Sequence, residues 1–210
     1  MRTKLDIENW NRKEHFNFFN GFEEPFFGIT VDIDCTSAYK TTKKIGASFF
    51  QYYLHKSLVA ANEITPFRYR IIDDEVWEYD SVDASAVITR EDGTFGFSYI
   101  KYDADFDVFS ANVKDAILEV QQSTGLKLAG AGENVIHCSA MPWLNFTALS
   151  HARNYSFKDS CPKFSYGKLK LEEDRMLLPL SVHVNHALMD GFHVSQMVNR
   201  FQQLLSETGI

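Results

Sequence analysis

The sequence predicts an α/β protein, namely a two-layer α/β sandwich with a mixed β-sheet. Segments with alternating apolar residues, typical of strands, are interspersed with segments whose apolar residues recur every three or four positions, typical of helices. The two kinds do not follow a regular strand–helix–strand order, and this irregular order favours a mixed sheet over an all-parallel one. Because the 210 residues contain no repeat or linker, we expect one domain, 1–210.

Helices are predicted where apolar residues recur with helical spacing. The clearest cases are the mid-chain segment that follows two aspartates able to cap it, and the last segment, which has an apolar stripe. The predicted helices are 8–19, 48–64, 106–122 and 194–205.

Strands are predicted where apolar and polar residues alternate or where short apolar runs end at turn residues. The predicted strands are 26–33, 67–72, 76–79, 84–89, 95–102, 134–139, 164–171 and 176–185. Acidic turns at 73–75 and 172–175 would close two hairpins.

Charge and composition exclude several classes of protein. The net charge of −7 argues against nucleic acid as a main partner, because phosphate binding needs a positive surface. No apolar run is long enough to span a bilayer, and the first residues lack the apolar stretch of a signal peptide. Cys35, Cys138 and Cys161 show neither a disulfide framework nor metal-ligand spacing. We therefore expect a cytoplasmic protein with buried free thiols.

The stretch 183–193 is the most informative part of the chain. His186 lies where the strand 176–185 ends, and Asp190 and Gly191 follow before the last helix. A neutral imidazole at such a junction can act as a general base near pH 7. Gly191 would allow a tight turn or a close backbone approach. Taken alone, the histidine fits a core position better than a catalytic one, and Gly191 fits an ordinary glycine before a helix equally well.

Three other segments accompany this motif in a fixed order along the chain. They are NWNRKEHF at 9–16, FRYR with DDEVWEYDSV at 67–82, and SAMPWLNF at 139–146. Together with His-x-x-x-Asp-Gly at 186–191, they closely resemble the chloramphenicol acetyltransferase family over nearly the whole chain. The resemblance implies a CoA-dependent acyltransferase fold and O-acetyl transfer from acetyl-CoA to a hydroxyl of chloramphenicol or a related small molecule, an activity that gives antibiotic resistance.

The resemblance also assigns roles to four residues. His186 matches the general base that removes the proton of the acceptor hydroxyl. Ser139 matches the serine whose hydroxyl donates to the oxyanion of the tetrahedral intermediate. Asp190 and Arg12 match a structural ion pair that joins the two ends of the chain. Read without the resemblance, Ser139 is an ordinary strand serine, and Asp190 and Arg12 are two unrelated surface charges.

The acceptor side of the family pocket is apolar and aromatic. The residues that resemble it are Phe19, Phe27, Phe95, Phe97 and Ser165. Four positions depart from the family pattern: Glu23 and His151 stand near usual leucines, Phe97 replaces a small alanine, and Asn185 replaces a histidine. These departures put chloramphenicol itself in question more than they affect acetyl transfer.

By the same resemblance we expect acetyl-CoA as co-substrate, bound in a tunnel, and a homotrimer whose active sites lie between subunits. We expect no metal, because His183, His186 and His193 lack the spacing of a zinc site. Two alternatives stay open. One is a dihydrolipoamide-type acyltransferase domain, which shares the His-x-x-x-Asp-Gly motif, and the other is a non-catalytic trimer that binds a small molecule.

Overall fold

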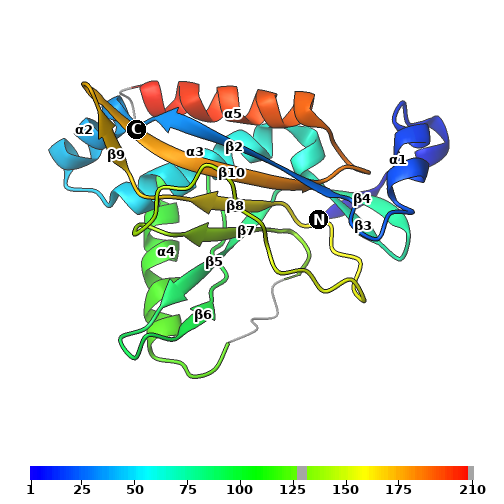
Figure 1. The fold of residues 1–210 in the computed structure, drawn as a ribbon. Helices are drawn as coiled ribbons and strands as arrows, with labels where there is room; N and C mark the ends of the chain where they lie inside the picture. The colour runs from blue at the N-terminus through cyan, green and yellow to red at the C-terminus, as the bar shows by residue number, and fades with distance from the viewer. Residues whose placement is uncertain (127–131, 208–210) are drawn as a thin grey trace.

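The computed structural model describes residues 1–126 and 132–207, and these form two layers, helices against a large sheet (Figure 1). The helices are η1 (Ile7–Asn9), α1 (Lys13–Phe19), α2 (Thr36–Ile45), α3 (Phe49–Glu63), η2 (Thr65–Arg68), α4 (Phe106–Gln121) and α5 (Gly191–Ser206). The strands are β1 (Arg2–Lys4), β2 (Phe26–Asp34), β3 (Tyr69–Ile72), β4 (Glu75–Tyr79), β5 (Asp83–Thr89), β6 (Phe95–Phe97), β7 (Val135–Ala140), β8 (Lys163–Tyr166), β9 (Lys170–Glu172) and β10 (Arg175–Asn185). None of the helices in the described ranges has the length and apolar character needed to cross a membrane.

The large sheet has the strand order β2-β10-β8-β7-β5-β6, and β9 also pairs with β10. β5, β7 and β8 are parallel, whereas β10 runs antiparallel to both β8 and β2. The predicted mixed sheet is therefore confirmed. β10 is the structural centre, because it pairs over nine residues with β2 on one side and joins β8 on the other.

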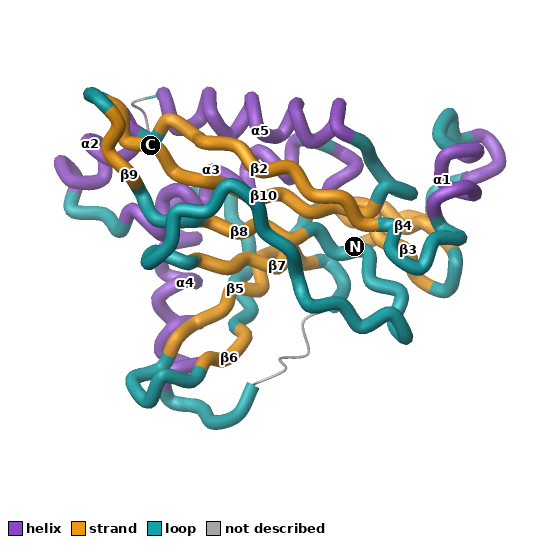
Figure 2. The backbone as a smooth tube through the Cα atoms, viewed as in Figure 1, coloured by secondary structure: helices purple, strands orange, loops and turns teal. Residues whose placement is uncertain are grey.

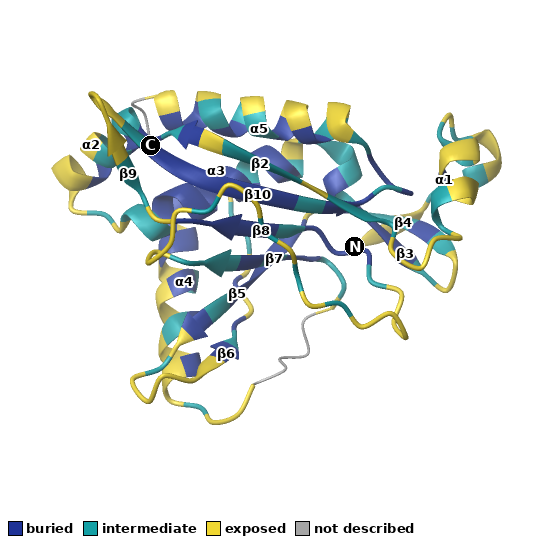
Figure 3. Cartoon of the chain, in the orientation of Figure 1, coloured by how far each residue is buried: buried dark blue, intermediate teal, exposed yellow. Residues whose placement is uncertain are grey.

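One face of the sheet carries the core. Leu178, Leu180, Val182 and Val184 of β10 are buried under the helices. α5 lies along β2 and packs against α3, and its apolar stripe is buried while its outer face is exposed (Figure 3). Burying this stripe removes most of its apolar surface from water, which stabilises the helix against the sheet.

The opposite face of the sheet carries polar side chains in register. One row across β7, β8, β10 and β2 is Ser139, Ser165, Ser181 and Thr30, and the next row is His137, Lys163, His183 and Gly28. Paired residues in register point to the same side of a sheet. The irregular segment 141–162 crosses this face (Figure 2), and several of its side chains line pockets together with β7.

Gly28 makes room for the imidazole of His183 on this polar face. The two residues are partners in the β2–β10 pairing. A Cβ on Gly28 would overlap the His183 ring, so a residue with a side chain here would displace the histidine.

A three-stranded sheet, β1-β4-β3, stands at the end of the molecule near α1 (Figure 1). Arg70 of β3 is fully buried, and its guanidinium donates to four carbonyl oxygens, including those of Glu133 (2.6 Å) and Val135 (2.7 Å). Because a buried cation is costly without partners, these bonds fix β3 against the entry to β7.

Most predicted elements are confirmed, with several differences. The expected helix 8–19 is a short 3₁₀ turn followed by α1, and the expected strand 95–102 ends at Phe97. The expected strand 164–171 is divided into β8 and β9. α2 was not predicted, because its sequence is largely polar and only Ala38 and Thr42 are buried.

Candidate active site

His186 lies at the turn after β10, between two aromatic rings from the first part of the chain. The ring of Phe19 stacks on the imidazole with a centroid distance of 4.0 Å and an interplanar angle of 6°, and Phe27 lies at 4.6 Å. The backbone N–H of His186 donates to the carbonyl oxygen of Pro25 (2.8 Å), which holds the turn beside β2. Nδ1 is buried and has no hydrogen-bond partner within residues 1–126 and 132–207. Nε2 is therefore the ring nitrogen left to meet a hydroxyl group.

The ion pair expected between Arg12 and Asp190 is present beside this histidine. Nη1 of Arg12 donates to Oδ2 of Asp190 (2.5 Å), and Nη2 donates to the carbonyl oxygen of His186 (3.4 Å). The side chains are 11% and 34% exposed, so the pair is partly shielded from water. Although burial opposes it, the hydrogen bond from Arg12 lowers the pKa of the Asp190 carboxyl.

Asp190 has a second structural contact, because it caps helix α5. Its Oδ1 accepts from the backbone N–H of Phe192 (3.0 Å), as expected of an N-cap aspartate. Both carboxylate oxygens are thus engaged within the chain. This arrangement fits a structural role for Asp190 better than a direct catalytic one.

Asn185, which departs from the family pattern, holds the turn that carries His186. Its Oδ1 accepts from the N–H of Ala187 (2.9 Å), and its carbonyl oxygen accepts from the N–H of Leu188 (3.1 Å). Gly191 begins α5, and a Cβ there would meet only Ile29, at 4.0 Å. The expectation that Gly191 permits a close backbone approach is therefore wrong.

Ser139 lies on β7 at the polar face of the sheet and lines a pocket of about 450 Å³. The lining residues are Ser85, Val87, Phe95, Phe97, His137, Cys138, Ser139, His151, Ala152 and Lys163. The hydroxyl of Ser139 is half-buried and makes no hydrogen bond to another described residue. It is therefore available to a ligand.

The other predicted acceptor residues have different positions relative to this pocket. Phe95 and Phe97 line it, and their rings pack edge to face with a centroid distance of 5.7 Å. His151 also lines it, and its buried Nε2 has no hydrogen-bond partner among the described residues. Ser165 is fully buried and does not line the pocket, although it is the register partner of Ser139 on the next strand.

The predicted site residues therefore form two separate groups. The first, which we call the histidine group, is Arg12, Phe19, Phe27, His186 and Asp190. The second, the serine group, is Phe95, Phe97, Ser139 and Ser165. No hydrogen bond, ion pair or ring contact joins the two groups across residues 1–126 and 132–207, and His186 does not line the pocket of Ser139.

Sequence reasoning missed two polar residues of the pocket, His137 and Lys163, which are register partners. Lys163 forms an ion pair with Asp159, and although burial opposes it, this charge lowers the pKa of the Asp159 carboxyl. Burial, and then the nearby Lys163 charge, lowers the pKa of His137 to about 4. No short motif indicated these residues. Only the position of His137 two residues before Ser139, on the same strand face, could have suggested its place.

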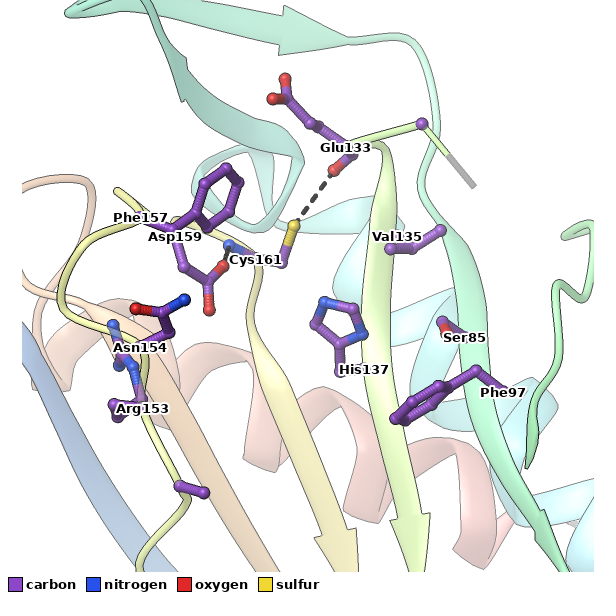
Figure 4. A pocket seen from close by; sticks show the side chains of 12 residues that line it. Ser85, Phe97, Glu133, Val135, His137, Arg153, Asn154, Phe157, Asp159 and Cys161 are labelled. Carbon is purple, nitrogen blue, oxygen red and sulfur yellow. Dashed lines mark hydrogen bonds between the residues drawn. The ribbon is translucent and has the colours of Figure 1, made fainter. Parts of the chain in front are cut away.

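All three cysteines are buried and free, as expected. The Cys161 thiol lies in a neighbouring pocket of about 380 Å³, which also contains Phe97, His137 and Asp159 (Figure 4).

The family model described as chloramphenicol acetyltransferase matches residues 1–202. Chloramphenicol acetyltransferase 3 of Escherichia coli is 36% identical over 205 residues, which are 96% of this chain and 96% of that protein. A solved structure of a chloramphenicol acetyltransferase, 34% identical, superposes with a TM-score of 0.90 and covers 98% of this chain and 100% of its own. A dihydrolipoamide acetyltransferase of Azotobacter vinelandii shares only the fold, with a TM-score of 0.64 at 14% identity, covering 93% of this chain and 86% of its own. By both sequence and structure, the chain belongs to the chloramphenicol acetyltransferase family of acyltransferases.

Proposed function

We propose that the protein is an acetyl-CoA-dependent O-acetyltransferase that acts on a hydroxyl group of chloramphenicol or a related small molecule. The observation that carries the proposal is the fixed position of His186. Two aromatic rings contact the imidazole, the backbone hydrogen bond to Pro25 holds the turn that carries it, and its Nδ1 is buried. Such a side chain presents Nε2 in one orientation, which general-base catalysis needs.

The two groups of residues take complementary parts in this reaction. Nε2 of His186 accepts the proton of the acceptor hydroxyl as the hydroxyl oxygen attacks the acetyl carbonyl carbon. When the tetrahedral intermediate collapses, the C–S bond breaks and His186 returns the proton to the coenzyme A thiolate, which leaves as the thiol. The hydroxyl of Ser139 donates to the carbonyl oxygen, on which negative charge develops. A donor in this position contributes roughly 3 to 4 kcal/mol in enzymes where it has been removed. Arg12 and Asp190 keep the turn of His186 in place and exchange no proton.

We further propose a homotrimer in which the histidine group of one chain faces the serine group of the next. The separation of the two groups within one chain supports this arrangement. Large exposed apolar side chains on the segment 141–162 support it too, since a subunit interface would remove them from water. The exposed residues are Trp143, Leu144, Tyr155 and Phe157.

In such a trimer the acceptor lies between Phe19 and Phe27 of one chain and Phe95 and Phe97 of its neighbour. Ser165 lies beside Ser139 on the adjacent strand, where it is fully buried and helps to shape the floor of the site. Acetyl-CoA reaches His186 along the interface between the chains, and no metal takes part in this step. We place the enzyme in the cytoplasm, where three free thiols persist.

Intersubunit complementation tests the proposal directly. His186→Ala and Ser139→Ala variants, each nearly inactive alone, are unfolded together, refolded and assayed for coenzyme A thiol release. With random mixing, three quarters of the trimers contain both chains, and each of these has one site with both residues intact. About a quarter of the wild-type activity should therefore return. Variants refolded separately and then combined without exchange serve as the control.

Recovery of activity favours an enzyme with shared sites over a non-catalytic binding trimer. An absence of recovery in a mixture shown to contain mixed trimers would mean that both residues act within one chain. Use of dihydrolipoamide as the acceptor in preference to chloramphenicol would instead favour the alternative acyltransferase.

A further inference from the structure

His137, Asp159 and Cys161 bring three different metal-ligating atoms into one pocket. An imidazole nitrogen, a carboxylate oxygen and the thiol sulfur all lie within 4.8 Å of one another. His137 projects from β7, whereas Asp159 and Cys161 come from the segment that leads into β8 (Figure 4). Tetrahedral zinc sites hold such atoms about 3.4 to 3.7 Å apart, so side-chain movements of about an ångström would close the set around an ion.

The segment that carries Asp159 and Cys161 is anchored on three sides. The hydroxyl of Ser160 accepts from the N–H of Ile71 (2.9 Å), and Nδ2 of Asn185 donates to the carbonyl oxygen of Asp159 (3.3 Å). The N–H of His137 donates to the carbonyl oxygen of Pro162 (2.9 Å), which joins the segment to β7 itself. A backbone fixed in this way lowers the entropy cost of assembling ligands.

The imidazole of His137 lines the pocket and is available to a cation there. Neither of its ring nitrogens has a hydrogen-bond partner in the described chain. The N–H of Cys161 donates to Oδ1 of Asp159 (2.8 Å), which orients the carboxylate.

Cys161 and Lys163 show what a bound cation would displace. The Cys161 thiol donates to the carbonyl oxygen of Glu133 (3.4 Å), and the Lys163 ammonium contacts Oδ2 of Asp159. On binding, the thiol proton would pass to solvent and the thiolate would turn from Glu133 to the metal. Lys163 would then give up or share its carboxylate.

We propose that His137, Asp159 and Cys161 form a zinc site, in which a water molecule from the adjoining pocket completes four-coordination. An imidazole nitrogen, a carboxylate oxygen and a thiolate sulfur are each ligand atoms that zinc accepts. The ion would tie the segment before β8 to β7 and so stabilise the pocket that contains Ser139. This role is structural and does not depend on acetyl transfer.

Cobalt(II) provides the spectroscopic test on the full chain after dialysis against a chelator. One equivalent of Co²⁺ should produce a near-ultraviolet thiolate charge-transfer band together with the strong visible bands of four-coordinate cobalt. Addition of Zn²⁺ should abolish both. The melting temperature of the chelated protein should rise with Zn²⁺, and this rise is independent of any acetyl-transfer assay.

Three variants identify the ligands. Cys161→Ala should lose the charge-transfer band, whereas Cys138→Ala, which removes another buried thiol, should keep it. His137→Gln should weaken Co²⁺ binding at least tenfold, with circular dichroism confirming that it folds. Lys163→Met should tighten binding by roughly tenfold, because a like charge near the ion is removed.

The proposal would be overturned by a stoichiometric titration with no thiolate band. A band that survives in Cys161→Ala, or the weak visible absorption of six-coordinate cobalt, would also overturn it, since the ion would then be held by other groups. Unchanged affinity in Lys163→Met would remove Asp159 from the ligand set.

Discussion

Arg12 and Asp190 are 178 positions apart in the sequence, yet Nη1 of one donates to Oδ2 of the other at 2.5 Å. The guanidinium also reaches the carbonyl oxygen of His186. The start of the chain therefore stabilises the turn that carries the proposed base. Because both partners are more shielded than an ordinary surface pair, their interaction should be measurable.

We expect His186→Ala to leave the protein folded and to lower the rate of acetyl transfer by about 10² to 10⁴, the usual range for loss of a general base. The measurement is kcat by thiol release, with circular dichroism as the check on folding. His15→Ala, which changes an exposed histidine of α1, is the matched control and should keep full activity. Near-normal turnover in His186→Ala would exclude the role of base.

Two substitutions of Asp190 should separate its contacts. Asp190→Ala removes the ion pair and the cap of α5, and we expect it to cost about 2 to 3 kcal/mol of stability. Asp190→Asn keeps an N-cap side chain and loses only the charge, so its cost should be smaller. Melting temperatures and activities of both variants provide the test. Full stability with complete loss of activity in either variant would make Asp190 a direct catalyst.

The pH dependence of stability should reveal the same pair. Since the pKa of Asp190 is lowered below its ordinary value of 3.8 in the folded state, its ionised form contributes stability above that value. This contribution disappears as the pH falls from 3.8 through the folded-state pKa. The difference in melting temperature between wild type and Asp190→Asn should thus still be present at pH 5 and shrink below 4. A difference that grows on acidification would contradict this assignment.

The molar mass in solution should show whether the protein is a trimer. Light scattering of the purified protein should give about three times 24.1 kDa. Dilution that produces monomers should abolish activity at the same concentrations, because each proposed site needs two chains. A monomer with full specific activity would exclude the shared site.

Substitutions in the Ser139 pocket should change acceptor preference. Phe97→Ala enlarges the pocket, and His151→Leu replaces a buried nitrogen without a hydrogen-bond partner. We expect the double variant to raise kcat/KM for chloramphenicol at least tenfold. Glu23 lies in a different pocket, beside Asn20 and Pro25, so Glu23→Leu alone should have a smaller effect. Unchanged kinetics in the double variant would mean that chloramphenicol does not contact these side chains.

The sequence predicted those parts of the fold that have a strong local pattern. The alternation before Asp34 and the apolar stripe after Val194 identified β2 and α5 to within three residues. β1 was not predicted, because its three residues are all exposed and form a strand only through their pairing with β4. Tertiary context of this kind is invisible to periodicity.

The candidate site shows the same difference between residues with a local sequence pattern and residues brought together only by the fold. His186, Asp190 and Arg12 were found through short motifs, each within a few residues of sequence. The cluster of His137, Asp159 and Cys161 has no comparable spacing, since β7 and the segment before β8 meet only in the folded sheet. Likewise, the burial of Ser165 follows from its place between two neighbouring strands.

The pairing of β2 with β10 has a consequence for how the protein is made. These two strands form the longest ladder of the sheet, yet β10 leaves the ribosome long after β2, because most of the described chain lies between them. Until then, β2 is an unpaired strand, and Phe19 and Phe27 have no histidine to enclose. Such late, non-local pairing is slow and leaves apolar strands open to wrong partners. A newly made chain should therefore depend on chaperones until β10 is released, and truncation before residue 186 should yield aggregates rather than a smaller folded protein.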